Sequence, residues 1–271
     1  MPYLEALALQ HALFERSPFD HLLLLEHPPV YPRGARADLA HLLVPPASVG
    51  AELVRSDRGG DVTFHGPGQL VGYPILTVPG KRGGGMADTV AFVTSVEQLV
   101  IDVLSDLGLA AAGRLRGYPG VWVDPDGSAP RKIAAIGVRL SRGRSMHGFA
   151  LNVDTDLTWF SHIVPCGIPD KAVTSLAAEG VDVAMREVVD AVVARAERRW
   201  GSEGVDRADV AWRHRPSDLS AFSRGEGPGE AVRGADEHLA GGARPAGDRG
   251  AVPVRLRGRL AAVGVTDGGP L

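Results

Sequence analysis

The spacing of apolar side chains along the chain predicts three helices. Residues 3–16 carry apolar positions at the three- and four-residue intervals of one helix face. A longer face follows Asp88, which suits an N-cap, and ends before Gly108, which suits a C-cap. Its apolar positions are Phe92, Val93, Val96, Leu99, Val100, Val103, Leu104 and Leu107. A third face runs from Met185 to Trp200, and Gly201 ends it.

Short apolar or alternating segments between these helices predict strands. The segments are 22–26, 61–64, 70–76, 120–123, 132–140 and 146–153. The turn His65-Gly66-Pro67-Gly68 joins the second strand to the third. Residues 31–50 and 161–171 are predicted to be irregular, and 81–86 a flexible basic loop. A mixture of strands and helices predicts an α/β or α+β fold.

The periodic pattern fades beyond about residue 213. The segment 213–271 holds 12 Gly and 5 Pro with little periodicity, which is typical of a disordered tail. Within it only Val252–Leu260 resembles a strand. We therefore predict one catalytic domain over residues 1–212 and a disordered tail over 213–271.

Composition narrows the class of protein. The formal net charge of the 271 residues is -3, so no general attraction to nucleic acid or to anionic membrane is expected. No apolar run is long enough to span a membrane, and the first residues lack the features of a signal peptide. A single cysteine excludes an intramolecular disulfide and a cysteine-based zinc cluster. These features predict a cytoplasmic protein.

That single cysteine, Cys166, is the candidate nucleophile. Two prolines and a glycine surround it in Pro165-Cys166-Gly167-Ile168-Pro169, which favours a turn rather than the middle of an element. The alternative is a buried cysteine that only packs. A reactive thiol needs a base or a nearby cation. The candidates are His65, His162 and Lys132, and from the residues alone a histidine is the default choice.

A glycine-rich segment, Arg58–Gln69, is the second candidate. Its four glycines permit close approach of a ligand, and Arg58, His65 and Gln69 stand between them, as in a narrow substrate channel. The alternative is a hairpin that only joins two strands. The segment lacks the pattern of a phosphate-binding loop. Small residues at 135, 137, 148 and 150 would share strand faces and leave a groove for an alkyl chain.

Taken together and in this order, these segments resemble the lipoyl(octanoyl) transferase family. The resemblance runs from about Tyr3 to Leu176. It is strongest over Leu22–Tyr31, Arg58–Leu76, Lys132–Val153 and Ile163–Leu176. It implies a mixed β-sheet with flanking helices and a smaller C-terminal subdomain, as in lipoate and biotin protein ligases. One departure is Pro32, where the family more often has threonine.

The resemblance also implies a chemistry. Cys166 is the acyl-accepting residue, and Lys132, in place of a histidine, lowers the pKa of the thiol and moves protons. The substrate-binding residues implied are Arg58, Gly59, Gly60, Asp61, Val62, Thr63, Phe64, His65, Ala135, Ile136, Gly137, Gly148, Phe149 and Ala150. Octanoyl-acyl carrier protein is the donor. The acceptors are lipoyl domains of 2-oxoacid dehydrogenase complexes and the glycine cleavage H protein. Neither ATP nor a metal is expected.

An acidic carrier protein predicts a basic docking face on this chain. The candidates are Lys81, Arg82, Arg114, Arg116, Arg142 and Arg144. Two other functions compete with the transferase: an ATP-dependent lipoate or biotin ligase on the same scaffold, and a catalytically silent protein that binds lipoyl domains or acyl carriers. Cys166, Lys132 and the lack of a phosphate loop favour the transferase.

Overall fold

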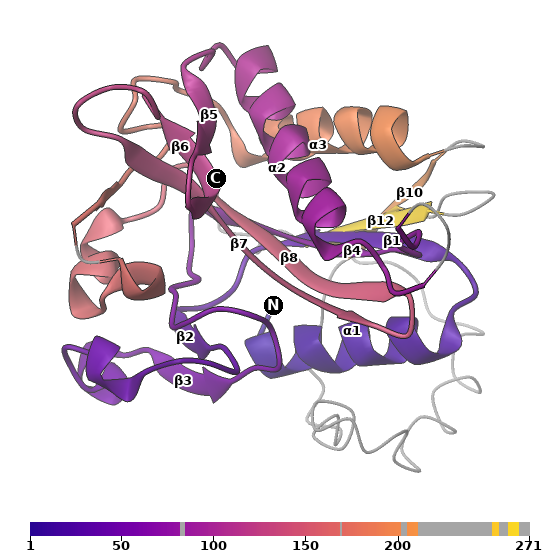
Figure 1. Ribbon diagram of the computed structural model, residues 1–271, viewed down its shortest axis with the longest axis horizontal. Coiled ribbons are helices and arrows are strands. Elements are labelled where there is room, and N and C mark those ends of the chain that lie inside the picture. Colours follow the sequence, from indigo (N-terminus) through magenta and orange to yellow (C-terminus); the bar gives the residue numbers. More distant parts are fainter. Residues whose placement is uncertain (82–84, 169, 202–204, 211–250, 255–259, 266–271) are drawn as a thin grey trace, which may run out of the picture.

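The computed structural model describes residues 1–81, 85–168, 170–201, 205–210, 251–254 and 260–265. A large sheet carries helix α1 (Tyr3–Arg16) on one face and helices α2 (Thr89–Asp106) and α3 (Met185–Trp200) on the other (Figure 1). All three predicted helices are confirmed. The Asp88 carboxylate caps α2 by accepting from the Ala91 N–H, and Gly108 lies one residue past the C-cap with φ 92°.

Ten strands form this sheet in the described part of the chain. They are β1 (Asp20–Leu25), β4 (Gln69–Ile75), β5 (Ala112–Leu115), β6 (Tyr118–Val123), β7 (Arg131–Ser141), β8 (Arg144–Asn152), β9 (Ala172–Val173), β10 (Asp206–Val210), β11 (Ala251–Val254) and β12 (Leu260–Val265). Their order is β10-β11-β12-β1-β4-β8-β7-β6-β5, with β9 beside β7. Most pairs are antiparallel, while β1–β12, β10–β12 and β7–β9 are parallel. The predicted mixed sheet with flanking helices is confirmed.

Strand β1 shows why a short apolar run suits the centre of this sheet. Leu22 and Leu24 pack with α2 and α3, whereas Leu23 and Leu25 pack with the side chains of α1. All four are fully buried, because helices cover both faces of the strand. The apolar run is therefore not amphipathic.

A second, two-stranded sheet lies beside the first. Strand β2 (Val30–Arg33) pairs in parallel with β3 (Glu52–Arg55), and the 3-10 helices Leu39–His41 and Pro46–Val49 connect them. The predicted strand at 61–64 is wrong. That segment runs beside β2 with isolated bridges at Val62 and His65, because Pro32 accepts from the Thr63 N–H but has no N–H to return.

The C-terminal segment contributes strands to the large sheet. Of residues 213–271 the structure describes Ala251–Val254 and Leu260–Val265, and both are strands. These strands join the large sheet through β1. The expected smaller C-terminal subdomain stays a prediction. The remainder of the predicted disordered tail lies outside the described residues, so a domain boundary at 212 stays a prediction. No described helix combines the length and the apolar character needed to cross a membrane.

Candidate active site

Cys166 lies on a sharp turn between the two sheets. The turn Pro165–Gly167 is a single 3-10 turn in which Cys166 has φ 56° and ψ 20°, a left-handed conformation that costs energy for any residue with a Cβ. Its N–H donates to the Val62 carbonyl at 3.1 Å, which ties the turn to the glycine-rich segment. Strain of this kind concentrates at functional sites. The predicted turn is thus present, with Cys166 half-buried at its centre.

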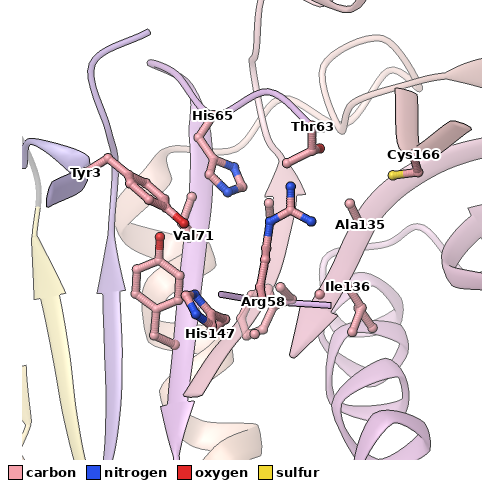
Figure 2. Close-up of a pocket in the computed structure, with 14 residues that line it drawn as sticks. Tyr3, Arg58, Thr63, His65, Val71, Ala135, Ile136, His147 and Cys166 are labelled. Atoms are coloured by element: carbon pink, nitrogen blue, oxygen red, sulfur yellow. The ribbon is translucent and has the colours of Figure 1, made fainter. Parts of the chain in front are cut away.

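Cys166 forms one end of a pocket that reaches into the large sheet. Tyr3 and His147 lie at the opposite end, and the Arg58 side chain lies between the two ends (Figure 2). Of the residues predicted for the site, those lining the pocket are Arg58, Thr63, His65, Ala135, Ile136, Gly137, Gly148, Phe149, Ala150 and Cys166. Strands β7 and β8 supply six of them, because Ala135–Gly137 pair in register with Gly148–Ala150.

The other predicted residues do not line this pocket. They are Gly59, Gly60, Asp61, Val62, Phe64 and Lys132. Four lining residues were not predicted: Tyr3, Val71, Tyr73 and His147. Tyr3 belongs to α1 and is far from the others in sequence, so only the tertiary fold reveals it. His147 directly precedes Gly148, a predicted site residue, and this adjacency was the only feature of the sequence that could have indicated its place in the pocket.

Arg58 occupies the middle of the pocket. Its guanidinium donates to the carbonyls of Pro32 and Asp61 at 2.6 Å and of Gly59 at 3.0 Å. Its Nε has no partner within the described residues. About 30 Å³ of space remains free, whereas an engineered cavity that binds benzene measures about 150 Å³. An eight-carbon chain therefore requires Arg58 or a neighbour to move.

The pocket end opposite Cys166 is polar yet uncharged. Burial, together with the charge of Arg58, lowers the pKa of His65 to about 3, and its Nδ1 lies 2.7 Å from the Gln69 side-chain oxygen. Burial raises the pKa of Tyr73 well above its usual value, and its hydroxyl lies 2.8 Å from His27 Nε2. These rings present neutral, hydrogen-bonded groups at neutral pH.

His147 couples the pocket to a surface charge network. Its Nε2 lies 2.6 Å from Asp57 Oδ1, and Asp57 also pairs with Arg139. Burial lowers the pKa of His147, so the neutral ring donates to the Asp57 carboxylate. Burial opposes the charge on Asp57, but the hydrogen bond from His147 and the charge of Arg139 hold its pKa well below its usual value. His147 Nδ1 has no partner among the described residues.

Lys132 is a buried residue of β7. Its ammonium nitrogen lies 4.8 Å from the centroid of the Trp122 ring, and the residue as a whole is 7% exposed. Lys132 is in register with Val173 of β9, and its carbonyl accepts from the Thr174 N–H at 2.9 Å. The segment that follows Cys166 in the sequence therefore returns to the large sheet, where β9 pairs with β7 at Lys132. No hydrogen bond of this ammonium to another described residue is present.

The two candidate histidines have other partners. His65 Nδ1 faces Gln69, and His162 Nδ1 lies 2.9 Å from the Tyr31 hydroxyl. A third histidine, which sequence reasoning missed, lies against the cysteine turn. His41 Nδ1 is 2.6 Å from Asp61 Oδ2, and a Cβ placed on Gly167 would be 2.9 Å from that oxygen. The predicted site residue Asp61 thus faces the turn and not the pocket.

Amide groups at the turn are already engaged. The N–H groups of Cys166, Gly167 and Ile168 donate to the carbonyls of Val62, Val164 and Pro165 at 3.0–3.1 Å. None of the three is available for a developing oxyanion in this conformation. Among the described residues, no cluster of three or more histidine, cysteine, aspartate and glutamate side chains could hold a metal ion.

A family model and several similar proteins point to the same family. The model of the lipoyl protein ligase A/B catalytic domain matches residues 2–197, which include Lys132 and Cys166. An octanoyltransferase of Acidothermus cellulolyticus is 48% identical over 200 residues, covering 72% of this chain and 86% of that protein. An octanoyltransferase of Mycobacterium sp. (strain KMS) is 51% identical over 201 residues, covering 71% and 79%.

A solved structure supports the fold. The crystal structure of lipoate-protein ligase A bound with ATP is similar with a TM-score of 0.57 at 19% identity, covering 82% of this chain and 87% of that chain. Likeness at this level of identity concerns the fold alone. Because a protein that binds ATP has the same fold, the fold does not decide whether a nucleotide is used here.

Proposed function

The chain belongs to the octanoyltransferase family, whose catalytic domain is that of lipoyl protein ligases A and B, and is an acyltransferase; we propose that it acts through an octanoyl thioester on Cys166. The donor in this proposal is octanoyl-acyl carrier protein, and the acceptor is a lysine of a lipoyl domain. The observation that carries the proposal is the strained Cys166 at the end of a pocket walled by Ala135–Gly137 and Gly148–Ala150.

In the first half-reaction the Cys166 thiolate attacks the carbonyl carbon of the donor thioester. A bond forms between the cysteine sulfur and the acyl carbon, the bond to the pantetheine sulfur breaks, and the carrier leaves with a free thiol. One thioester replaces another, so no ATP is required. The Lys132 ammonium stabilises the thiolate as an ion pair and acts as acid and base.

In the second half-reaction the amine of the acceptor lysine attacks the acyl-enzyme. An amine of this type has an unperturbed pKa near 10.4, so it must lose a proton before it attacks and another as the amide forms. Lys132, neutral after giving its proton to the departing pantetheine thiolate, takes up the first of these protons in this scheme. The product is an octanoyl amide on the lipoyl domain, and Cys166 returns to a thiolate paired with the Lys132 ammonium.

The pocket suits the acyl chain once Arg58 has moved. Each buried methylene contributes about 0.8 kcal/mol, and the walls offer small or apolar residues at Ala135, Ala150 and Phe149. A Cβ on Gly137 would lie 3.2 Å from Arg58 Cδ and 3.2 Å from the Gly59 carbonyl. Glycine at 137 therefore preserves the narrow space between β7 and the glycine-rich segment.

Several of the basic residues expected in the docking face have partners within the chain. Arg144 donates to the carbonyls that end α1, at Leu13, Phe14, Ser17 and Phe19, so it stabilises the helix end. Arg114 is paired with Glu97, and Arg142 with Glu15. Lys81 and Arg116 are exposed, whereas Arg82 lies outside the described residues.

Two arginines that were not expected suit an anionic partner better. Arg33 and Arg55 lie opposite each other in register on β2 and β3, where like charges destabilise a sheet. Neither guanidinium has an ion pair or hydrogen bond to another described residue. Arg33 also bridges to Val62, whose carbonyl holds the Cys166 N–H. We include this pair in the proposed docking face for the acyl carrier.

Nucleotide dependence tests the proposed function directly. The protein is incubated with octanoyl-acyl carrier protein and a lipoyl domain, with and without ATP, and the mass of the lipoyl domain is measured. Octanoylation without ATP is the expected result. Octanoylation only from free octanoate plus ATP would instead establish the ligase, and a failure of both donors would favour the silent binding protein.

A further inference from the structure

His41 and Asp61 form a hydrogen-bonded pair directly against the cysteine turn. His41 Nδ1 lies 2.6 Å from Asp61 Oδ2. A Cβ built on Gly167 would lie 2.9 Å from that same oxygen and 3.2 Å from His41 Cε1. Only a glycine in position 167 allows the imidazole and carboxylate to approach the residue after Cys166 so closely. Neither side chain lines the acyl pocket.

Backbone contacts hold this pair in one place relative to Cys166. The Val164 N–H donates to the His41 carbonyl at 2.8 Å, two residues before the cysteine. Asp61 Oδ1 accepts from the Val62 N–H at 2.6 Å and from the Asp38 N–H at 3.3 Å. Because the Val62 carbonyl accepts from the Cys166 N–H, the carboxylate, imidazole and nucleophile share one network.

The carboxylate determines which imidazole nitrogen can take a proton. An ionised Asp61 accepts from Nδ1–H, so the neutral ring carries its lone pair on Nε2. Nε2 has no protein partner within the described residues. A base oriented by a carboxylate beside a nucleophile is the arrangement used in acyl transfer on unrelated folds.

His41 is open to solvent, whereas Lys132 is buried. The His41 side chain is 29% exposed, and Lys132 as a whole residue is 7% exposed. A lysine carried on another protein reaches the acyl-enzyme from solvent. Of the two bases, His41 is therefore the more accessible to that amine, and Lys132 keeps its proposed role as partner of the sulfur.

We infer that His41, oriented by Asp61, accepts the proton that the acceptor amine loses in the second half-reaction. This inference rests on the proposed thioester route. The neutral amine attacks the acyl carbon, a C–N bond forms, and the C–S bond to Cys166 breaks. The nitrogen gives its proton to His41 Nε2, Cys166 leaves as a thiolate beside Lys132, and His41 returns the proton to solvent.

Separate measurement of the two half-reactions tests this assignment. Octanoyl-enzyme is prepared with octanoyl-acyl carrier protein, freed of donor, and mixed with a lipoyl domain, and intact masses are followed over one turnover. For His41→Gln we expect acylation at the wild-type rate and transfer slowed roughly 100-fold, so that acyl-enzyme accumulates. Asp61→Asn should slow transfer in the same selective way, because an amide can donate to Nδ1 and leave the proton on Nε2.

Asp38→Asn is the matched control, since it removes a neighbouring carboxylate that caps the 3-10 helix without touching the imidazole. Its transfer rate should equal that of the wild type. Equal slowing of acylation and transfer in both His41→Gln and Asp61→Asn would overturn the inference and make the pair a structural support of the turn. Unchanged transfer would place the base elsewhere. A wild type that forms no acyl-enzyme would instead refute the thioester route itself.

Discussion

The ammonium of Lys132 lies 4.8 Å from the centre of the Trp122 ring, and the two residues are paired in register across β7 and β6. This cation–π contact holds the long side chain in place. In the proposed mechanism this cation pairs with the Cys166 thiolate.

Trp122→Phe should therefore slow acylation without preventing it. The smaller ring keeps the site apolar but weakens the attraction to the cation by about 1 kcal/mol, which corresponds to roughly a fivefold slower step. The change also removes the indole N–H bond to the Tyr118 carbonyl. Thermal unfolding of the same variant separates lost stability from lost rate, and an acylation rate equal to wild type would show that the contact is only structural.

Gly167 and Gly143 offer a matched pair for testing the turn. Their φ values are 69° and 74°, so alanine is equally strained at both and should lower stability by about 1 kcal/mol. A Cβ at 143 meets nothing within 4 Å, whereas one at 167 meets Asp61 and His41. Gly167→Ala should lose most octanoyl transfer, and Gly143→Ala should retain it. Similar activities in the two variants would contradict the proposed importance of this contact.

Stability should fall as the pH is lowered from about 6.5 towards 3. The pKa of buried His65 is about 3, against about 6.5 in an unfolded chain, and burial also lowers the pKa of His27 and His147. In this window the unfolded state binds more protons, so unfolding becomes easier by about 1.4 kcal/mol per pH unit because of His65. His27 and His147 add to the decline in the same direction. Denaturant midpoints across this range provide the measurement.

His65→Gln isolates one of these groups. The variant should show a shallower decline of stability between pH 6.5 and 4 than the wild type, whatever its stability at neutral pH. Parallel curves for the two proteins would mean that His65 is protonated in the folded state and that its burial is incomplete.

Reversal of charge at Arg33 and Arg55 should weaken docking of the acyl carrier. The double variant Arg33→Glu/Arg55→Glu is expected to raise the KM for octanoyl-acyl carrier protein at low salt, with less difference at high salt because exposed charges are screened. Arg142→Glu is the control, since Arg142 is already paired with Glu15. An unchanged KM in the double variant would remove this pair from the docking face.

Sequence periodicity predicted the helices well and the short strands poorly. The apolar faces of α1, α2 and α3 repeat over many residues, and a cap such as Asp88 is local chemistry that a sequence displays. Strands β3, β5 and β9 have only two to four residues, and their pairing partners are distant, so local pattern did not predict them. Pro32 shows the reverse, since one missing N–H converts a strand-like segment at 61–64 into isolated bridges.

The family resemblance predicted most of the residues that line the pocket, but not those that come from distant parts of the sequence. Ala135–Gly137 and Gly148–Ala150 were expected and line the pocket, whereas Tyr3 and Tyr73 reach it through the tertiary fold. His41 was missed because its relation to Cys166 depends on a connection between β2 and β3 that carries no pattern. Asp61 was expected in the site, yet it faces this histidine and not the pocket.

The central claim is that Cys166 carries the octanoyl group, and the mass of the intact protein after incubation with octanoyl-acyl carrier protein tests it most directly. Without ATP, the wild type should gain one octanoyl group that hydroxylamine removes, Cys166→Ala should gain none, and Lys132→Ala should gain it slowly. A wild type that gains no adduct yet still transfers octanoate to a lipoyl domain would contradict the account. An adduct of the same size on Cys166→Ala would contradict it equally.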